Sequence, residues 1–443
     1  MLSAVARMKR RAVTRLKDWV RYSPITREVS SAVGLVRSWF QPRLVDGLIL
    51  AYRTEFGPLQ RYSATRICRR FDDPVSAPDV SLNAHWSHFL RTTELKRSIL
   101  LKAPGQNGEK GVLLVYGEYN WVKLLAIPGA FADLDARFTL LFSTGWSPFD
   151  YRLLGFVLRK TTGPVLIEPP NFGDVSRIEA LHPRIKCLPT ICCDWINPGF
   201  FTPKPLAERR IDLLMVANWA PFKRHWHFFA ALRKMPRDLR VTLVGQSDGP
   251  YKLDGVRQQA KDFGACQDIR YIDSLSVEDV YDAMCDSRGL VILSRREGPC
   301  VAVTEALFAD TPVAMLRNAH IGSRAYINNE TGTLLDYRQM AEQLMNLLEK
   351  RDRFRPREWA DKNISCHISL ARWNTFLREA AKAEGRPWTR DLVPFCMKPF
   401  TVYLQREDRA AMQPVYEGLN RLYPELFGPN FLLQSEPPIP RHT

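Results

Sequence analysis

Short apolar runs alternate with amphipathic stretches along most of this chain, a pattern typical of α/β proteins. A short run that is apolar throughout and is bounded by turn residues predicts a strand buried on both faces, as in a parallel sheet. In the first half we predict strands at Gly111–Tyr116, Phe138–Phe142 and Pro164–Ile167, and helices at Val122–Leu134 with a break at Pro128-Gly129, at Tyr151–Lys160 and at Asp174–Leu181.

The second half repeats this alternation. Strands are predicted at Asp212–Val216, Arg240–Val244, Ile269–Ile272, Leu290–Leu293 and Val313–Met315. One helix is predicted to end at Leu232, and two more are predicted at Met340–Lys350 and at His367–Lys382. Between the halves, Asp194–Pro205 is rich in proline, glycine and aromatic residues and is the expected crossing between two domains. We therefore expect two doubly wound, Rossmann-like domains.

The first 20 or so residues predict a basic amphipathic helix. Its apolar residues at helical spacing are Val5, Met8, Ala12, Leu16 and Trp19, and its basic residues are Arg7, Lys9, Arg10, Arg11, Arg15 and Lys17. Such a helix suits the surface of an anionic membrane leaflet. It equally suits a helix docked on the protein with a solvated charged side. The sequence leaves both alternatives open.

Composition narrows the class of protein. A chain of 443 residues with a net charge of +16 is long enough for two domains and favours an anionic partner, such as a phosphate-bearing substrate, acidic lipid or nucleic acid. No recognisable nucleic-acid-reading module is present, so we expect no nucleic-acid partner. The nine cysteines form no Cys-x-x-Cys pair, which fits a reducing cytoplasm. No apolar stretch approaches the length of a membrane span, and no secretory signal is recognised.

The most informative segment is a strand, a turn and a helix that carry Glu297 and Glu305. The apolar run at Gly289–Ser294 predicts a buried strand, and Pro299 suits the first position of the following helix. Backbone N–H groups around Cys300, Val301 and Ala302 then open the helix and create an anion site. Two carboxylates thus flank a phosphate-sized hole, which suits a nucleotide-sugar.

This segment resembles the Glu-x7-Glu motif of the retaining glycosyltransferase family 4, whose members have the two-domain GT-B fold. The chain also resembles the family around Asn218-Trp219-Ala220-Pro221-Phe222-Lys223, where Lys223 falls on the family lysine and Asn218 stands where arginine is usual. The strand ending at Gly245 and the turn at Asn328–Gly332 follow in the family's order. The resemblance covers roughly residues 211–380, and Cys300 and Asp310 replace small glycines common in the family.

The resemblance implies two Rossmann-like domains facing across a cleft (GT-B), with N- and C-terminal extensions. The expected boundaries are an N-terminal extension at 1–103, an acceptor domain at 104–205, a donor-binding domain at 206–365, and a crossing helix with a C-terminal extension at 366–443.

The resemblance also implies roles for individual residues. The catalytic pair would be Glu297, which holds sugar hydroxyls, and Lys223, which neutralises the departing diphosphate. Donor binding would involve Glu305 on the ribose, together with Asn218, Gly298, Pro299, Cys300 and Val301. From the loops after the first-domain strands we predict Trp121, Trp146 and Ser147 as acceptor-binding residues. No metal or cofactor is expected, and Asp133-Leu134-Asp135 is interpreted as surface charge. His225 and His227 are expected to pack rather than to touch substrate.

The hypothesis is a retaining glycosyltransferase of the hexosyltransferase type, with a nucleotide-sugar donor and a glycan or lipid-linked acceptor. We expect it to act in cell-surface polysaccharide biosynthesis and to be cytoplasmic, peripheral on the inner face of the membrane through residues 1–20. Two alternatives share the architecture: a catalytically silent GT-B scaffold protein and a nucleotide-sugar epimerase.

Overall fold

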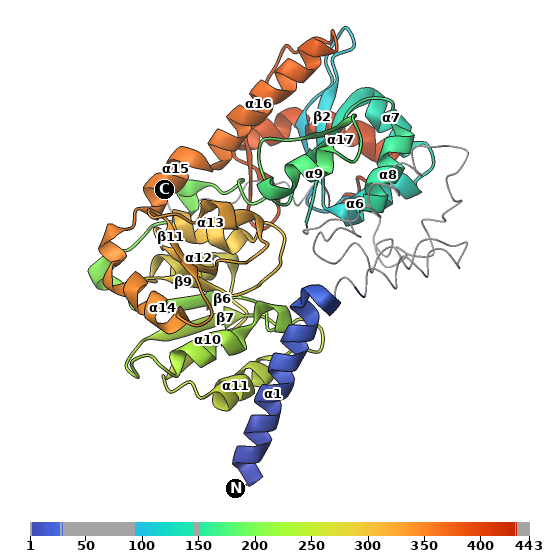
Figure 1. The fold of residues 1–443 in the computed structure, drawn as a ribbon. Helices are drawn as coiled ribbons and strands as arrows, with labels where there is room; N and C mark the ends of the chain where they lie inside the picture. The colour runs from blue at the N-terminus through green and yellow to red at the C-terminus, as the bar shows by residue number, and fades with distance from the viewer. Residues whose placement is uncertain (1, 27–28, 30–93, 146–150, 430, 432–443) are drawn as a thin grey trace. The chain divides into compact units, whose positions relative to one another are not determined.

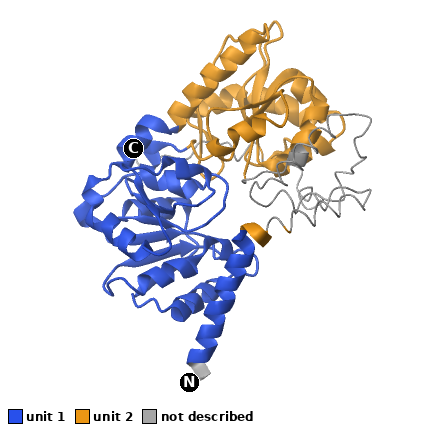
Figure 2. Ribbon diagram, viewed as in Figure 1, with its two compact units in different colours: residues 1–23, 196–365 blue, residues 24–195, 366–443 orange. Residues whose placement is uncertain are grey.

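The computed structural model describes residues 2–26, 29, 94–145, 151–429 and 431. The chain divides into two compact units, which Figure 2 distinguishes by colour. Unit 1 comprises residues 1–23 and 196–365, and unit 2 comprises residues 24–195 and 366–443. The chain therefore passes from unit 2 to unit 1 after Trp195 and returns after Ser365. The sequence placed these two boundaries at 205/206 and 365/366.

Unit 1 is built on a six-stranded parallel sheet with the order β11-β10-β9-β6-β7-β8. Read from β8 inward, this is the 3-2-1-4-5-6 order of the Rossmann fold, and the order reverses between β6 and β9. The strands are β6 (Leu213–Val216), β7 (Val241–Gly245), β8 (Ile269–Asp273), β9 (Leu290–Ile292), β10 (Val313–Leu316) and β11 (Gly332–Leu335).

Helices cover this sheet because each presents an apolar side to it. The helices of this part are α10 (His225–Leu232), α11 (Leu253–Phe263), α12 (Val277–Cys285), α13 (Val301–Phe308), α14 (Met340–Glu349) and α15 (Pro356–Asn363). In α13, for example, Val303, Ala306 and Leu307 have no exposed surface. The strands β6, β7, β9 and β10 are almost entirely buried, as their apolar sequences predict, whereas the edge strand β8 has no buried residue.

In its described residues, unit 2 carries a five-stranded sheet in the order β1-β2-β3-β4-β5, parallel except for β1. Its strands are β1 (Ile99–Lys102), β2 (Gly111–Tyr116), β3 (Phe138–Ser143), β4 (Val165–Glu168) and β5 (Ile185–Cys187), and its helices are α6 (Glu118–Ala126), α7 (Ala130–Arg137), α8 (Tyr151–Lys160) and α9 (Val175–Glu179). The prediction of two Rossmann-like domains is thus confirmed for the architecture of each unit.

The C-terminal segment adds to unit 2. It forms α16 (Cys366–Ala383), the hairpin of β12 (Phe395–Met397) and β13 (Thr401–Tyr403), and α17 (Arg406–Leu422). The predicted helix at His367–Lys382 is confirmed as α16. Trp373 of this helix is fully buried, and its indole N–H donates to Thr190 Oγ1 at 2.7 Å.

Some elements differ from the prediction. The break predicted at Pro128-Gly129 is confirmed, because the helical segment is divided into α6 and α7 and Gly129 adopts a left-handed backbone with φ of 77° at the start of α7. Strand β1 lies inside the predicted N-terminal extension, and β5, the β12–β13 hairpin and α17 were not predicted. These strands have three or four residues each, too few for a clear periodic signal.

The N-terminal segment is a helix, as predicted: α1 spans Leu2–Tyr22. It belongs to unit 1 and lies against α11, as Figure 1 shows. Its polar side makes the contacts, since Arg10 donates to both carboxylate oxygens of Asp262 at 2.8 and 2.7 Å. Its apolar residues face outward instead: Met8 is 69% exposed and Leu16 is 60% exposed.

Candidate functional site

The candidate site lies where the loops after β6 and β9 meet, because β6 and β9 are neighbours at the point where the strand order reverses. Lys223 ends a short turn after β6, and Glu297 lies in the loop between β9 and α13. The Lys223 Nζ donates to Glu297 Oε1 at 2.6 Å. Both side chains are mostly buried, with 16% and 10% of their surface exposed. The structure therefore brings together two residues that the sequence separates by 74 positions.

The loop that carries Glu297 is fixed by backbone hydrogen bonds to the segment after β10. The Glu297 N–H donates to the His320 carbonyl at 3.2 Å, and the His320 N–H donates to the Arg295 carbonyl at 2.7 Å. One turn later, the Ser323 N–H donates to the Pro299 carbonyl at 3.1 Å. These hydrogen bonds fix the backbone on both sides of Glu297, and the ion pair with Lys223 orients its carboxylate.

Helix α13 begins directly after this loop. Cys300 precedes it with φ of 57°, a left-handed conformation that glycine adopts without strain. The Val303 N–H donates back to the Cys300 carbonyl at 3.1 Å. Within the described part of the chain, the N–H groups of Val301 and Ala302 have no hydrogen-bond acceptor. The start of α13 thus offers the unpaired amides that an anion needs.

Glu305 lies in α13, about one helical turn after Val301, the first residue of the helix. Burial raises the pKa of its carboxyl group from the ordinary 4.5 to about 7, and a hydrogen bond from the Tyr281 side chain partly opposes this shift. The residue nevertheless keeps some of its surface accessible. Glu305 therefore changes charge near neutral pH, unlike an exposed glutamate.

Cys300 shows that the three groups share one neighbourhood. Burial raises the pKa of its thiol, and the charges of Glu297, Lys223 and Glu305 all act on it. For Lys223, burial lowers the pKa, but the neighbouring carboxylate of Glu297 more than compensates and the pKa is raised. Lys223 is accordingly an ammonium ion at neutral pH. The structure thus places two acids and one ammonium group close to Cys300 at the start of α13, whereas their roles stay a prediction.

Asn218 occupies the edge of the site. Its Nδ2 donates to Asp248 Oδ2 at 3.0 Å, and its Oδ1 is buried with no hydrogen-bond partner among the described residues. Asp248 also contributes to the raised pKa of Lys223, so it lies near the ammonium group. Asn218 therefore binds an acid here instead of adding the positive charge that an arginine would supply.

Gly245, at the end of β7, supports the loop that carries Asn218 and Lys223. A Cβ atom at this position would lie 2.2 Å from the Ala217 carbonyl oxygen and 2.7 Å from the Trp219 ring. Only glycine fits, because the first of these neighbours is backbone. Trp219 in turn donates from its indole N–H to Asp273 Oδ1 at 2.8 Å.

The sequence did not indicate that the end of α1 reaches this site. Tyr22 is 5% exposed and lies between two guanidinium groups, with Arg224 at 5.3 Å and Arg295 at 5.7 Å from its ring centre. Arg224 follows Lys223 directly, and Arg295 belongs to the loop that carries Glu297. One aromatic side chain of α1 therefore contacts both loops of the site. No sequence signal marks this contact, because it joins segments far apart in the chain.

Of the three residues predicted to bind an acceptor, the structure describes only Trp121. Trp121 lies in α6 with no exposed surface, donates to the Val115 carbonyl at 3.3 Å and packs edge-on against Phe142 at 5.2 Å. The prediction that Trp121 binds an acceptor is wrong, since a sugar cannot reach the ring. Trp146 and Ser147 lie outside the described residues.

His225 packs as expected. It is 2% exposed, its ring lies 5.7 Å from that of Trp219, and burial together with Lys223 lowers its pKa to about 3.

Among the residues with described positions, no group of three or more His, Cys, Asp or Glu side chains is arranged to hold a metal ion. The expectation that the reaction needs no metal ion therefore stays a prediction. None of the described helices is both long and apolar enough to span a bilayer.

Comparison with protein families gives one match. Residues 200–363 match the model of the family described as "Glycosyl transferases group 1". The matched segment lies within unit 1, covers β6 to β11 and includes both loops of the site, so this part of the chain is similar to group 1 glycosyltransferases. A comparison with curated proteins returned no match.

Solved structures with a similar fold include glycosyltransferases. The G117R mutant of TarM from S. aureus, solved with UDP, is 13% identical with a TM-score of 0.44, over 59% of this chain and 54% of that one. Sucrose-phosphate synthase from Thermosynechococcus elongatus is 15% identical with a TM-score of 0.47, over 61% and 74%. Anabaena Alr3699/HepE, solved with UDP and glucose, is 14% identical with a TM-score of 0.47, over 61% and 77%. The chain thus spans about half the length of TarM.

Proposed function

We propose that this protein is a retaining glycosyltransferase of family 4 that moves a sugar from a nucleotide-sugar donor to a glycan or lipid-linked acceptor in cell-surface polysaccharide biosynthesis. The observation that carries the proposal is the placement of Lys223, Glu297 and Glu305 around Cys300, at the unpaired amides that open α13. The match of residues 200–363 to group 1 glycosyltransferases supports the same activity.

In the proposed mechanism the donor's diphosphate binds at the N–H groups of Val301 and Ala302. Lys223 turns from Glu297 to the phosphate and neutralises the charge that develops on it as the sugar leaves. Glu297, freed from the ion pair, accepts hydrogen bonds from the sugar hydroxyls and stabilises positive charge at the anomeric carbon. Glu305 accepts hydrogen bonds from the ribose hydroxyls. The departing phosphate takes the acceptor's proton, as in family 4, so no protein base is required.

We also propose that the reaction needs no metal ion, because an ammonium group and a helix N-terminus can together stabilise the departing diphosphate. Turnover that is unchanged in EDTA would support this point. Loss of turnover in EDTA with recovery on adding a divalent cation would refute it without affecting the assignment of Lys223 and Glu297.

A donor screen by calorimetry tests the function. The wild-type protein should bind one of the UDP-, GDP- and ADP-sugars, and Lys223→Ala and Glu305→Ala should each weaken that binding strongly. Lys252→Ala is the matched control, because Lys252 is an exposed lysine of the same unit outside the site. Absence of binding to any nucleotide-sugar, or equal binding by all variants, would contradict the proposal.

One observation favours a second candidate, a catalytically silent scaffold. Asn218 hydrogen-bonds Asp248 where an arginine would supply charge to the donor, which weakens the positive potential of the site. Turnover of the bound donor by the wild-type protein would exclude this candidate. Donor binding without turnover, in the presence of a glycan acceptor mixture, would support it.

For localisation we propose a peripheral protein on the cytoplasmic face of the membrane. The outward side of α1 exposes Val5, Met8, Leu16 and Trp19, each by more than half of its surface. An exposed apolar stripe of this kind on a basic helix suits the interface of an anionic bilayer. Lipid-linked acceptors would be reached from that position.

A further inference from the structure

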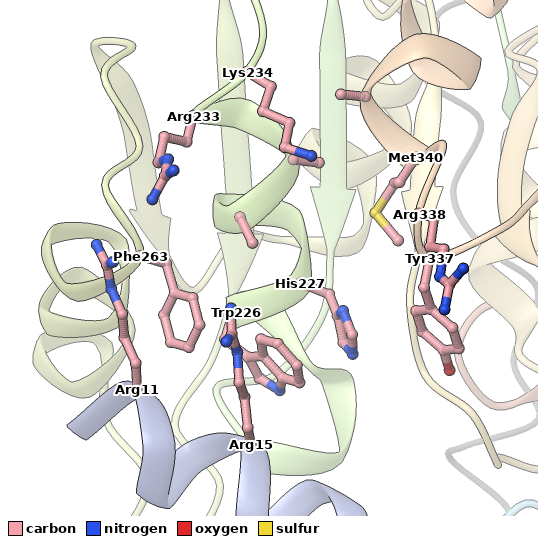
Figure 3. A pocket seen from close by; sticks show the side chains of 13 residues that line it. Arg11, Arg15, Trp226, His227, Arg233, Lys234, Phe263, Tyr337, Arg338 and Met340 are labelled. Atoms are coloured by element: carbon pink, nitrogen blue, oxygen red, sulfur yellow. The ribbon is translucent and has the colours of Figure 1, made fainter. Parts of the chain in front are cut away.

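An open cavity of about 350 Å³ lies on unit 1, and none of its lining residues is Lys223, Glu297 or Glu305. As Figure 3 shows, it is bordered by α1, by α10 and the residues just after it, by the end of α11, and by the segment that leads into α14. Five cationic side chains line it, and no acidic residue is among its lining residues. The cations are Arg11, Arg15, Arg233, Lys234 and Arg338.

Two acids at α1, Asp18 in the helix and Asp262 against it, are already paired with other residues. Asp262 accepts from Arg10, and Asp18 accepts two hydrogen bonds from Arg224. Within the described part of the chain, the side chains of Arg15, Arg233, Lys234 and Arg338 are exposed and have no ion-pair or hydrogen-bond partner. Among the lining residues, the positive charge of the cavity is therefore not balanced by an acid.

The cations come from different elements, and two of them, Arg11 and Arg233, lie close to each other. A Cβ atom built on Gly264 would lie 3.5 Å from Arg11 Nη2 and 3.2 Å from Arg233 Cδ, so these two side chains flank the same glycine. Figure 3 shows Arg11 and Arg15 reaching from α1, and Arg233 and Lys234 approaching from beyond α10. Like charges held close together repel each other unless an anion lies between them.

The wall of the cavity is aromatic and uncharged. The His227 ring stacks on Trp226 at 3.5 Å and on Tyr337 at 4.8 Å, and Phe263 lies 5.2 Å from Trp226. Burial, together with Arg224 and Arg15, lowers the pKa of His227 to about 2, so this imidazole stays neutral. The cavity thus combines an apolar wall with a cationic rim, which suits a ligand that has a phosphate at one end and a ring or carbon chain at the other.

We propose that this cavity is a second anion site, which binds the phosphate group of a phosphorylated organic ligand independently of the nucleotide-sugar site. Four of the five cations are arginines, whose planar forks match the geometry of phosphate oxygens. The volume holds more than an inorganic ion, and it is within the range of small-ligand pockets. None of the lining residues is Lys223, Glu297 or Glu305, so the two sites can be separated by mutation.

Two sources share this ligand chemistry. One is a phospholipid headgroup, because α1 contributes Arg11 and Arg15 to the cavity and exposes its apolar residues on another side. The other is a soluble phosphorylated metabolite. The experiment below has one arm for each source.

The soluble arm uses calorimetric titration of the full chain with pyrophosphate at low salt. The double variant R233Q/K234Q should weaken pyrophosphate binding about tenfold or more, since two charge-assisted contacts are lost. Arg237→Gln is the matched control, because Arg237 is an exposed arginine near Lys234 in sequence but outside the cavity, and it should bind as the wild-type protein does. Lys223→Ala, which damages the nucleotide-sugar site, should also leave this binding event in place.

The lipid arm measures sedimentation with vesicles of phosphatidylcholine alone or mixed with phosphatidylglycerol. Loss of phosphatidylglycerol-dependent binding in R233Q/K234Q, but not in Arg237→Gln, would identify a lipid headgroup as the source. Unchanged vesicle binding with weakened pyrophosphate binding would identify a soluble ligand. The proposal is overturned if R233Q/K234Q, folded by circular dichroism, matches the wild-type protein in both arms, or if pyrophosphate binding disappears only in Lys223→Ala. Failure of the glycosyltransferase proposal would instead appear as absent nucleotide-sugar binding.

Discussion

Asp18 of α1 accepts two hydrogen bonds from the guanidinium group of Arg224, at 2.8 Å and 2.7 Å, and Arg224 directly follows the lysine of the candidate site. The same guanidinium donates to the Tyr337 hydroxyl at 2.6 Å and lies over the Tyr22 ring. Arg224 has φ of 59°, so its backbone is in a left-handed conformation that other contacts must hold in place. The N-terminal helix therefore helps to position the Lys223 loop.

The first prediction follows from this contact. Asp18→Asn leaves Arg224, whose side chain is 3% exposed, without its counter-charge. We expect the free energy of unfolding to fall by about 2 kcal/mol and nucleotide-sugar affinity to fall several-fold, because the Lys223 loop loses a fixed neighbour. Denaturant titration and calorimetry measure the two effects. Arg10→Gln is the control, since Arg10 ties α1 to Asp262 away from the loop and should lower stability without changing donor affinity.

The second prediction concerns the ion pair of the site. Glu297→Gln keeps the shape of the side chain but removes the charge that faces the sugar, and we expect kcat to fall about a hundredfold or more. Because Lys223 is then released from its partner, affinity for the free nucleoside diphosphate should stay equal or rise. Steady-state kinetics and calorimetry on the same preparation check both statements. A Glu297→Gln variant with wild-type turnover would show that this carboxylate is not part of the machinery.

The third prediction is a pH dependence of stability. Burial raises the pKa of Glu305 to about 7 from the ordinary 4.5, so the folded protein keeps a proton that the unfolded chain has lost. Its contribution to stability is complete below about pH 4.5, is lost as the pH rises to about 7, and then stays constant. Across that window Glu305→Gln should gain about 2 to 3 kcal/mol relative to the wild-type protein.

Denaturant titrations of both proteins at several pH values measure this difference. In the folded protein His225 and His227 are neutral over this range, because their pKa values are lowered to about 3 and about 2 from the ordinary 6.5. The unfolded chain still titrates both near 6.5, but this contribution is the same in the two proteins and cancels in the difference between them. Parallel stability curves for the wild-type and Glu305→Gln proteins would show that the carboxyl group is solvated in solution.

The fourth prediction compares two residues with the same unusual backbone. Cys300 and Asp310 have φ of 57° and 53°, a left-handed conformation that glycine adopts without strain. Cys300→Gly removes the Cβ strain and gains chain entropy in the unfolded state, so stability should change by less than about 1 kcal/mol, whereas Cys300→Val should cost about 1 to 2 kcal/mol. Denaturant titration distinguishes these outcomes.

Asp310→Gly should behave differently from Cys300→Gly. The Asp310 carboxylate accepts from Arg351 at 2.8 Å and from Arg209 at 3.2 Å, and both arginine side chains are almost fully buried. Removing the acid leaves their charges without a partner, which should cost about 2 kcal/mol or more despite the relief of strain. Equal stability of the two glycine variants would show that these ion pairs contribute little.

Particular residues show which features of the site could be predicted from the sequence. The sequence shows that Lys223 and Glu297 each follow an apolar strand, and the family resemblance implies that they act together. The structure places both at one edge of the sheet, where the carboxyl ends of the neighbouring parallel strands β6 and β9 lie. Trp121 follows a strand too, but it lies within α6, where its side chain turns into the core with Leu124 and Leu125. Position after a strand predicts the edge of the sheet but not the direction of a side chain within the following helix.

The N-terminal helix shows a second limit. Periodicity identified its apolar and basic residues, but it could not tell which side would contact the protein. The structure docks the polar side through Arg10 and Asp18, since their partners Asp262 and Arg224 come from segments more than 200 residues away. Contacts of this range have no local signal. The cavity lined by Arg11 and Arg15 was missed for the same reason.

The last prediction tests the outward side of α1. Leu16 and Trp19 are 60% and 56% exposed, so the double variant L16E/W19E removes no packing within unit 1 and should leave its stability and its nucleotide-sugar affinity unchanged. Binding to vesicles that contain phosphatidylglycerol should fall about tenfold or more, because apolar area is lost and two negative charges meet an anionic surface. The control L16Q/W19Q, which loses the apolar area without adding charge, should have an intermediate effect. Vesicle binding that is equal in all three proteins would mean that the exposed stripe does not face lipid, and α1 would then serve only to hold Arg224 and the Lys223 loop.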